Sequence, residues 1–318
     1  RAMTPGAASD AGEASEADTA GDDGRASDAG DATERIDVPD FPVDDVVDAH
    51  VHLMPDRLMR AIRGALTEEA GWEFPHPTDR DRLIERLTAA GVDRSIVLPY
   101  AHRPGVAREI NEWITDRTAA TEEMIPFATV HAGDEDVGAV VTDAFEAGAR
   151  GLKFQLPVQG FPADDPRLAP AYEAAVEYDV PVTMHAGTAP MFREDPNVGV
   201  EPFRSFLDSF PDVRTCVAHM GTYDDGAFVE LAREYDSVYL DTTFAMSSVA
   251  DRYMDFDPSS IPDAVFEDLS SSIMYGSDYP NIPYHYARER EHLLSRDLSR
   301  ETWRDLFSRT ARRYLGEY

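Results

Sequence analysis

The chain has 318 residues, 42% of them hydrophobic, which fits one large domain with ample material for a core. Its 61 acidic residues against 29 basic ones give a formal net charge of −32, which repels phosphate backbones and anionic lipid surfaces and argues against nucleic acid or membrane partners. Such an excess of acid, with almost no lysine, is typical of adaptation to high salt, where screening removes self-repulsion, so we expect a halophilic source.

Residues 1–40 differ from the rest of the chain in composition. They hold 11 acidic residues against three arginines and contain no aromatic residue. Such a segment cannot bury enough apolar surface to offset its chain entropy. We therefore predict a disordered acidic tail over residues 1–40 and a single domain over residues 41–318.

Three absences in the sequence bear on the compartment in which the protein works. The first residues lack the basic start and the apolar stretch of a signal peptide, and no apolar run approaches the length of a membrane span. Cys216 is the only cysteine, so no internal disulfide is expected, and its place in an apolar strand is typical of a small core residue. We expect a cytoplasmic protein.

The first predicted strand, residues 46–53, ends in a His-Val-His sequence. Strand alternation places His50 and His52 on the same side of the strand. Two imidazoles directed at one point make half of a metal site. The alternative is two unrelated polar residues on an edge strand, and the remaining strands decide between the two interpretations.

The fourth predicted strand, residues 151–157, contains Lys153, the only lysine of the chain. Arginine supplies every other basic side chain, so a lysine inside an apolar strand argues for a role that arginine cannot fill. An amine, unlike a guanidinium, can lose its proton and react. We therefore predict that Lys153 belongs to the active site, and a structural ion pair inside the fold is the alternative.

Three later predicted strands each end in a potential metal ligand: His185, His219 and Asp278. Imidazole nitrogen and carboxylate oxygen are ligand types that zinc and similar divalent ions accept, and a catalytic site leaves one position for water. A single histidine in a core is common. Four histidines and an aspartate, all at strand ends, are hard to explain in that way.

Strand-like and helix-like segments alternate from residue 41 onward. Eight strands are predicted, at residues 46–53, 94–100, 124–131, 151–157, 181–187, 214–220, 238–244 and 273–279. Amphipathic segments typical of helices lie between them, at residues 79–90, 106–119, 136–148, 166–178, 227–235 and 284–294. Eight βα units predict an α/β fold of the (β/α)8 or TIM-barrel type, whose chemistry lies where the strands end. Residues 54–77 exceed a simple loop, and we expect a lid or part of a substrate wall there.

In this order the residues resemble the amidohydrolase superfamily, and within it the amidohydrolase-related branch that includes the aminocarboxymuconate semialdehyde decarboxylases. The resemblance covers about residues 44–316. It rests on the paired histidines after the first strand, on His185 and His219, on the Gly-Ser-Asp-Tyr-Pro run around Asp278, and on a closing Ala-Arg-Arg-Tyr-Leu-Gly stretch. Thr310 is a departure, because asparagine is usual there in the family, and it bears on helix packing more than on chemistry.

The resemblance implies that His50, His52, His185 and Asp278 ligate one divalent metal ion, most often zinc. Such an ion lowers the pKa of its bound water toward neutrality and polarises a substrate oxygen. Asp278 would accept the proton as that water attacks, and His219 would orient the water or stabilise a developing oxyanion. Asp278 and His219 are therefore the predicted catalytic residues.

Lys153 resembles the strand-four position at which some superfamily members carry a carboxylated lysine that bridges two metal ions. His219 would then help to hold the second ion. Because the branch resembled here usually works with one metal, we favour an ordinary ammonium at Lys153 that binds an anionic group of the substrate. His102 and Arg103 follow the second strand and are further candidates for substrate binding.

The resemblance leaves two enzyme classes open for a small-molecule substrate. We favour a metal-dependent hydrolase of an amide, ester or lactone, because nothing in the loops marks a pocket for an aromatic carboxylate. The alternative is a nonoxidative decarboxylase of a small unsaturated or aromatic carboxylic acid on the same metal site, with Arg103 or Arg193 holding the carboxylate. A metal-binding barrel without turnover is a third alternative, against which stands the full ligand set. The sequence leaves open whether the chain forms a homo-oligomer.

Overall fold

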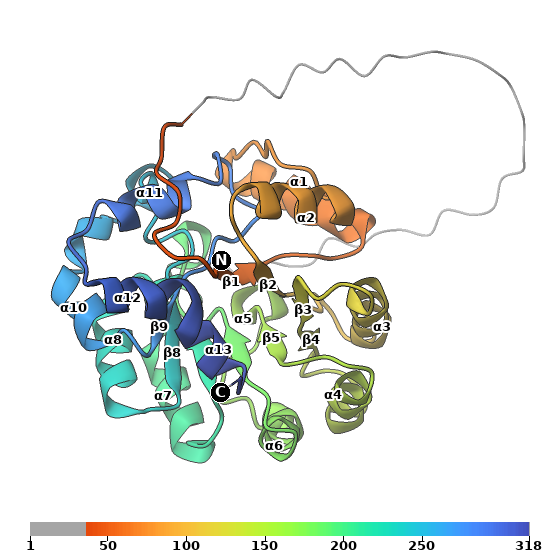
Figure 1. Ribbon diagram of the computed structural model, residues 1–318. Helices are drawn as coiled ribbons and strands as arrows, with labels where there is room; N and C mark the ends of the chain where they lie inside the picture. The colour runs from red at the N-terminus through yellow and green to blue at the C-terminus, as the bar shows by residue number, and fades with distance from the viewer. Residues whose placement is uncertain (1–35, 318) are drawn as a thin grey trace, which may run out of the picture. The chain divides into compact units, whose positions relative to one another are not determined.

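The computed structural model describes residues 36–317, which form a barrel of parallel strands surrounded by helices (Figure 1). The strands are β1 (Val47–Val51), β2 (Arg94–Val97), β3 (Met124–Pro126), β4 (Ala128–Thr129), β5 (Leu152–Phe154), β6 (Val182–Met184), β7 (Thr215–Val217), β8 (Val238–Asp241) and β9 (Ile273–Met274). They pair in parallel in chain order, β1 to β3 and β4 to β9. The predicted (β/α)8 barrel is confirmed. Most of the acidic tail predicted over residues 1–40 lies outside the described residues.

Two sets of backbone hydrogen bonds close this row of strands. The third strand of the barrel consists of β3 and β4, and Phe127 between them donates its N–H to the carbonyl of Val97 at 3.0 Å. At the other seam, the N–H of Ala49 in β1 donates to the carbonyl of Tyr275, directly after β9, at 2.8 Å. The first strand therefore lies beside the eighth.

Helices cover the outside of the barrel (Figure 1). The α-helices are α1 (Asp56–Ala70), α2 (Arg80–Ala89), α3 (Ala107–Thr118), α4 (Val137–Glu146), α5 (Leu156–Gln159), α6 (Ala169–Glu177), α7 (Val200–Ser209), α8 (Asp225–Glu234), α9 (Ala250–Met254), α10 (Asp263–Asp268), α11 (Arg288–Leu294), α12 (Arg300–Arg304) and α13 (Thr310–Tyr314). A π-helical turn, Asp305–Arg309, joins the last two. Asp79 and Asp136 cap the starts of α2 and α4 by accepting backbone N–H bonds. All six predicted helices are present, with shifted ends.

The segment at residues 54–77 contains a helix, α1, that the sequence pattern did not predict. It begins after Pro55 and ends at Gly71, whose φ of 69° lies in the left-handed region that glycine adopts at little cost. Met59 is the one buried residue of this helix. Arg63 adds a polar attachment, because its guanidinium donates to the carbonyl of Pro280 at 2.7 Å.

One glycine determines how closely the eighth strand approaches the first. A Cβ atom at Gly276 would overlap the hydroxyl of Thr243 and come within 2.9 Å of the Cβ of His50. The backbone after β9 can therefore pack directly against His50 only because this position has no side chain. Gly276 thus allows residues at the ends of the two strands to meet.

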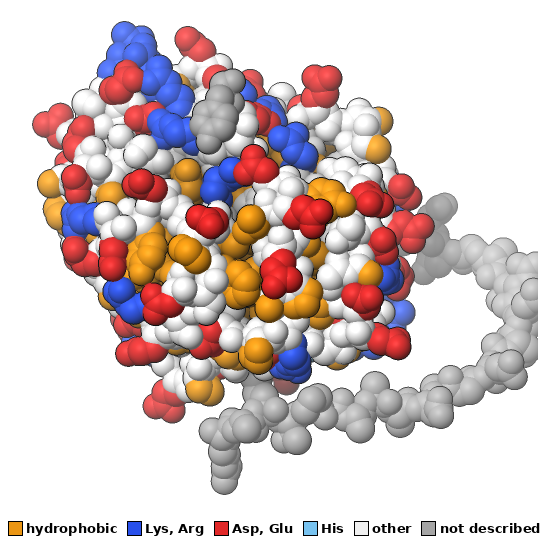
Figure 2. Space-filling view, turned by 90° about the horizontal axis from the view of Figure 1, so that it is seen from below, with side chains coloured by type: hydrophobic (Ala, Val, Ile, Leu, Met, Phe, Trp, Pro, Cys, Tyr) orange, Lys and Arg blue, Asp and Glu red, His pale blue; other side chains and the backbone are white. Residues whose placement is uncertain are grey.

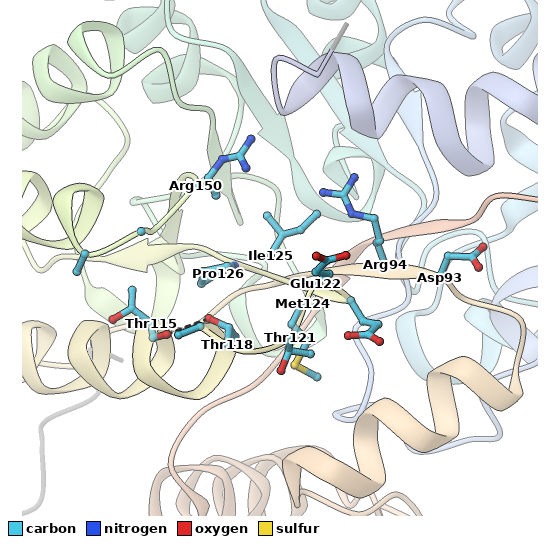
Figure 3. Close-up of a pocket in the computed structure, with 14 residues that line it drawn as sticks. Asp93, Arg94, Thr115, Thr118, Thr121, Glu122, Met124, Ile125, Pro126 and Arg150 are labelled. Carbon is cyan, nitrogen blue, oxygen red and sulfur yellow. Dashed lines mark hydrogen bonds between the residues drawn. The ribbon is translucent and has the colours of Figure 1, made fainter.

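A groove of about 870 Å³ lies at the amino ends of the strands (Figure 3). Among its lining residues, Arg94 begins β2, Met124 begins β3 and Arg150 precedes β5. In barrels of this type the active site lies at the opposite, carboxyl ends of the strands. This groove is therefore not the expected place for catalysis.

The surface of the domain is acidic. From residue 41 onward the sequence holds 50 acidic residues against 26 basic ones. Figure 2 shows acidic side chains spread over one face of the molecule rather than gathered in one patch. Surface arginines pair with part of this charge, as in Arg94 with Glu317 at 2.6 Å and Arg233 with Asp268 at 2.8 Å. Residues 36–317 contain no helix that combines the length and the hydropathy of a membrane span.

We predict that salt stabilises the protein. A net charge of −32 opposes the compact state by self-repulsion, and the screening length falls from about 10 Å at 0.1 M to about 3 Å at 1 M ionic strength. The thermal midpoint, followed by circular dichroism, should therefore rise from low to multimolar potassium chloride. A midpoint that stays flat over this range would contradict the halophilic expectation. Potassium chloride is chosen because sulfate would also strengthen hydrophobic burial.

Candidate metal centre

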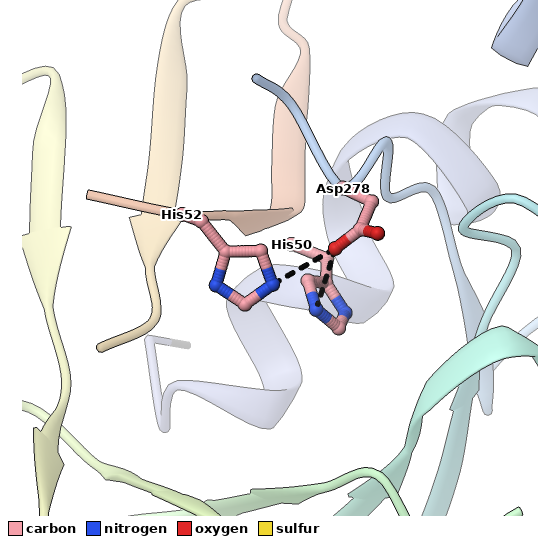
Figure 4. Close-up of side chains that lie close together, drawn as sticks. All are labelled: His50, His52 and Asp278. Atoms are coloured by element: carbon pink, nitrogen blue, oxygen red, sulfur yellow. Dashed lines mark ion pairs between the residues drawn. The ribbon is translucent and has the colours of Figure 1, made fainter. Parts of the chain in front are cut away.

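Three side chains converge at the carboxyl ends of the first and eighth strands of the barrel (Figure 4). His50 lies on β1, His52 directly follows it, and Asp278 comes after β9. The Nε2 of His52 lies 2.8 Å from Oδ1 of Asp278, and the Nε2 of His50 lies 3.5 Å from the same oxygen. Both histidines are buried, whereas the Asp278 side chain is 15% exposed. Asp278 therefore keeps the cluster in contact with solvent.

The other ring nitrogens of both histidines face groups that only accept hydrogen bonds. The Nδ1 of His52 lies 2.7 Å from the carbonyl of Leu98, and the Nδ1 of His50 lies 2.8 Å from the carboxylate of Asp241. With the proton on Nδ1, the Nε2 of a neutral imidazole carries a lone pair. Both lone pairs face the carboxylate of Asp278, which is repulsive unless a cation or a proton lies between them, and the ammonium of Lys153, 3.4 Å from the Nε2 of His50, relieves part of this repulsion. The donor set therefore fits a divalent metal ion.

The electrostatics of the cluster agree with this fit. Burial, together with the positive charge of Lys153, lowers the pKa of His50 to about 3 despite the opposing charge of Asp241. Burial acts to raise the pKa of Asp278, but His52 and His50 outweigh it, and the net pKa lies below its usual value. A neutral His50 and an ionised Asp278 are the protonation states in which these groups bind metal.

His185 and His219 lie against each other rather than within the group of three. The Nδ1 of His185 is 3.2 Å from the Nε2 of His219, whose Nδ1 is 3.1 Å from the carbonyl of Thr243. Burial and the charge of His219 hold the pKa of His185 well below its usual value. Within residues 36–317 the Nε2 of His185 is buried without a hydrogen-bond partner. The Nε2 of His185 is therefore free to coordinate a metal ion. His185 does not, however, belong to the close group that the other three predicted ligands form.

Lys153 is fully buried inside the barrel, beside the cluster. It lies on β5, and its Nζ is 3.4 Å from the Nε2 of His50. Burial lowers its pKa to about 8, although the charges of Asp241 and Asp278 act in the opposite direction. Among the described residues no carboxylate forms a direct ion pair with Lys153, which argues against a purely structural pair.

Asp241 connects several of these groups, and the sequence analysis missed it. It ends β8 and is completely buried. One carboxylate oxygen contacts the Nδ1 of His50, and the other accepts the backbone N–H of His219 at 2.9 Å. A carboxylate behind a histidine ligand fixes the tautomer and orientation of the ring. The sequence held a usable signal, because Asp241 is a charged residue at the end of an apolar strand.

Aromatic side chains surround the candidate centre. Tyr100, after β2, lies edge to face with His52 at a ring distance of 5.9 Å. Phe244 lies 6.4 Å from the ring of His219 and stacks on Trp72 at 5.2 Å. Trp72 belongs to the segment at residues 54–77, so this segment reaches His219 through the ring of Phe244.

The other predicted substrate-binding residues make no polar contact with the cluster within the described part of the chain. His102 and Arg103 are both exposed. Arg193 pairs with Asp255 at 2.7 Å and lies over the ring of Tyr223 at 4.1 Å. A position after a strand end places a residue near the mouth of the barrel, but it does not fix the direction of its side chain.

Comparison with known proteins gives one family match and several similar structures. A family model described as Amidohydrolase matches residues 47–316, and no curated protein matches the chain significantly. An uncharacterised TIM-barrel protein from Bordetella bronchiseptica superposes with a TM-score of 0.67 at 16% identity, covering 86% of this chain and 99% of that one. A 5-carboxyvanillate decarboxylase from Novosphingobium aromaticivorans, solved with manganese and 4-hydroxy-3-methoxy-5-nitrobenzoic acid, gives 0.58 at 17%, covering 86% and 96%. A 2,6-dihydroxybenzoate decarboxylase from Rhizobium gives 0.59 at 16%, covering 86% and 99%. Similarity at these identities shows the fold alone.

We predict that His50, His52, His185 and Asp278 bind one divalent ion. Alanine at any of the four positions removes a ligand, so bound metal should fall from about one ion per chain to near zero while the circular dichroism spectrum stays unchanged. Elemental analysis after dialysis measures the metal. His102→Ala, which removes an exposed histidine, is the matched control and should keep its metal. Full occupancy in His185→Ala would exclude that residue as a ligand.

Proposed function

The chain belongs to the Amidohydrolase family, and we propose that it is a metal-dependent hydrolase that cleaves an amide, ester or lactone bond of a small molecule. The observation that carries the proposal is the convergence of His50, His52 and Asp278. In (β/α)8 enzymes the catalytic groups stand at the carboxyl ends of the strands, where these three lie. The acidic composition argues against nucleic acid and membrane partners, and we propose a cytoplasmic location.

In this proposal His50, His52, His185 and Asp278 hold the ion, and zinc is the metal we favour. Imidazole nitrogens with one carboxylate oxygen match the ligands of catalytic zinc sites. The ion, when bound, lowers the pKa of coordinated water and polarises a substrate oxygen. Manganese is the alternative, because it also accepts carboxylate ligands and because the similar 5-carboxyvanillate decarboxylase was solved with it.

Asp278 and His219 carry the proton chemistry in this proposal. Asp278 is ionised near neutral pH, since its pKa lies below the usual value, and it can accept a proton from the attacking water. The Nδ1 of His219 is bonded to the carbonyl of Thr243, so the Nε2 of the neutral ring is an acceptor. His219 would orient the water by accepting a hydrogen bond from it in place of the present contact between this Nε2 and the Nδ1 of His185, and it would stabilise an oxyanion only when protonated.

Lys153 is the residue we propose for binding an anionic group of the substrate. A pKa of about 8 leaves most of the side chain protonated at neutral pH. A carboxylated Lys153 that bridges a second ion is the less favoured alternative, and His219 is the residue that would then help to hold this ion. His102 and Arg103, being exposed, would contact only parts of a substrate that extend to the rim of the barrel.

A nonoxidative decarboxylase is the second candidate. Two observations favour it: the similar structures include two decarboxylases of aromatic acids, and Tyr100, Phe244 and Trp72 place aromatic rings around the candidate centre. Against it, Arg193 is engaged with Asp255, and Arg103 has no contact with the cluster. Lys153 is therefore the basic side chain left to bind the carboxylate of such a substrate. A metal-binding barrel without turnover is the third and least favoured candidate.

A turnover screen separates these candidates. The full chain, loaded with Zn²⁺ or Mn²⁺ in multimolar potassium chloride, is assayed against panels of lactones, esters, amides and aromatic carboxylic acids. Hydrolysis products without carbon dioxide release would support the hydrolase. Carbon dioxide release from an aromatic acid would replace it by the decarboxylase. Metal binding without turnover on any panel would favour the non-catalytic barrel.

Lys153→Arg provides a specific prediction for the active site. The variant keeps the charge, but it cannot form a carbamate or occupy the same volume. Activity should fall at least about tenfold, which corresponds to 1.4 kcal/mol of transition-state stabilisation. Metal content should stay unchanged unless a carboxylated Lys153 had been a ligand. Arg204→Lys, an exchange between the two basic residues at an exposed ion pair, is the control. Unchanged turnover in Lys153→Arg would remove Lys153 from the site.

A further inference from the structure

We propose that Asp48 is a positioning residue of the metal centre, which connects the strand of His50 to the turn of Asp278. The inference rests on the proposed metal site and extends it to a residue outside the predicted ligand set. Strand alternation places Asp48 on the same side of β1 as His50. Its side chain is completely buried.

Three donors surround the carboxylate of Asp48. Oδ1 accepts the backbone N–H of His50 at 3.1 Å. Oδ2 accepts the hydroxyl of Ser277 at 2.6 Å and the hydroxyl of Tyr286 at 2.9 Å. A buried carboxylate is costly unless hydrogen bonds satisfy it. The need to satisfy Asp48 therefore holds all three donors in place.

Ser277 extends this network to the neighbouring residue, Asp278. Its hydroxyl donates to Asp48 and accepts the backbone N–H of Tyr279 at 3.1 Å, so it bridges the two sides of Asp278. Asp278 has a φ of 60°, in the left-handed region that is unfavourable for residues other than glycine. Hydrogen bonds on both sides of Asp278 therefore support the conformation in which its carboxylate meets the histidines.

Tyr286 connects the same carboxylate to the segment before α11. Its ring packs edge to face against Tyr279, the residue after Asp278, at a ring distance of 5.5 Å. Asp48 thus joins three parts of the chain: β1, the turn after β9 and the segment before α11. Two of these parts carry proposed ligands.

Backbone hydrogen bonds already set the register between β1 and the turn. The N–H of Asp278 donates to the carbonyl of His50 at 2.8 Å, and the N–H of His52 donates to the carbonyl of Tyr279 at 2.7 Å. The Asp48 network adds contacts directly beside His50 and Asp278. Its loss would change the angles at which the donor atoms meet without removing a ligand, and losses of this kind typically weaken metal binding by about 10–100-fold.

Metal titration of single variants tests this role. Ser277→Ala and Tyr286→Phe each remove one donor to Asp48, and Asp48→Asn replaces one acceptor oxygen by an amide. Zn²⁺ affinity of the full chain is measured in multimolar potassium chloride by competition with a chromogenic chelator. The Kd should rise about 10–100-fold with an unchanged number of ions bound at saturation, whereas variants of the ligands themselves should lose the ion altogether. The thermal midpoint of each metal-free variant is measured in parallel.

Two control variants remove comparable bonds elsewhere. Ser308→Ala removes a serine hydroxyl that donates to Asp45, and Tyr172→Phe removes a buried hydroxyl that donates to the carbonyl of Ala163 at 2.7 Å. Wild-type Zn²⁺ affinity in the Asp48-network variants would overturn the inference, as would a loss of affinity that merely follows a fall in thermal midpoint to the extent seen in the controls. A wild-type chain that binds no Zn²⁺ would instead refute the metal centre itself.

Discussion

Hydrogen-bond acceptors that face one another inside a protein repel, and the carboxyl end of this barrel brings three of them together. The Nδ1 atoms of His50 and His52 face a carboxylate and a carbonyl, so their Nε2 lone pairs are directed at Asp278, and the ammonium of Lys153 lies 3.4 Å from the Nε2 of His50. Solvent reaches only part of the cluster, because both imidazoles are buried. A bound cation would replace this repulsion by coordination. The neighbouring residues hold His50, His52 and Asp278 in the positions in which they can bind it.

The architecture supplies the arrangement through the seam between the first and the last strand. Closure of the barrel lays β1 beside β9, and Gly276 removes the side chain that would keep them apart. Charges are distributed around the same seam. Asp241 holds His50 from behind, while Lys153 adds a buried positive charge on the other nitrogen of that ring. Two carboxylates and the Lys153 ammonium therefore lie in contact with the imidazole of His50, near the ends of four strands.

Much of this organisation could be predicted from the sequence, because it follows from local patterns. Alternation and strand ends identified the barrel and the three converging residues, and the absence of other lysines identified Lys153. Helix α1 was missed because it is additional to the helices of the eight βα units and lies between the first strand and its own helix, α2. The side-chain directions of His102 and Arg103 depend on loop packing, which no short pattern encodes. Asp241 was overlooked because its role depends on His50 and on the backbone of His219, which lie far from it in the sequence.

The central claim is that one divalent ion joins β1 to the turn after β9. Anomalous X-ray scattering from crystals grown with Zn²⁺, recorded on both sides of the zinc absorption edge, measures this directly. The account predicts a single strong anomalous peak at about 2.0–2.2 Å from the Nε2 atoms of His50 and His52 and from a carboxylate oxygen of Asp278. A map without a peak between these three side chains, or with its only peak elsewhere on the acidic surface, would contradict it.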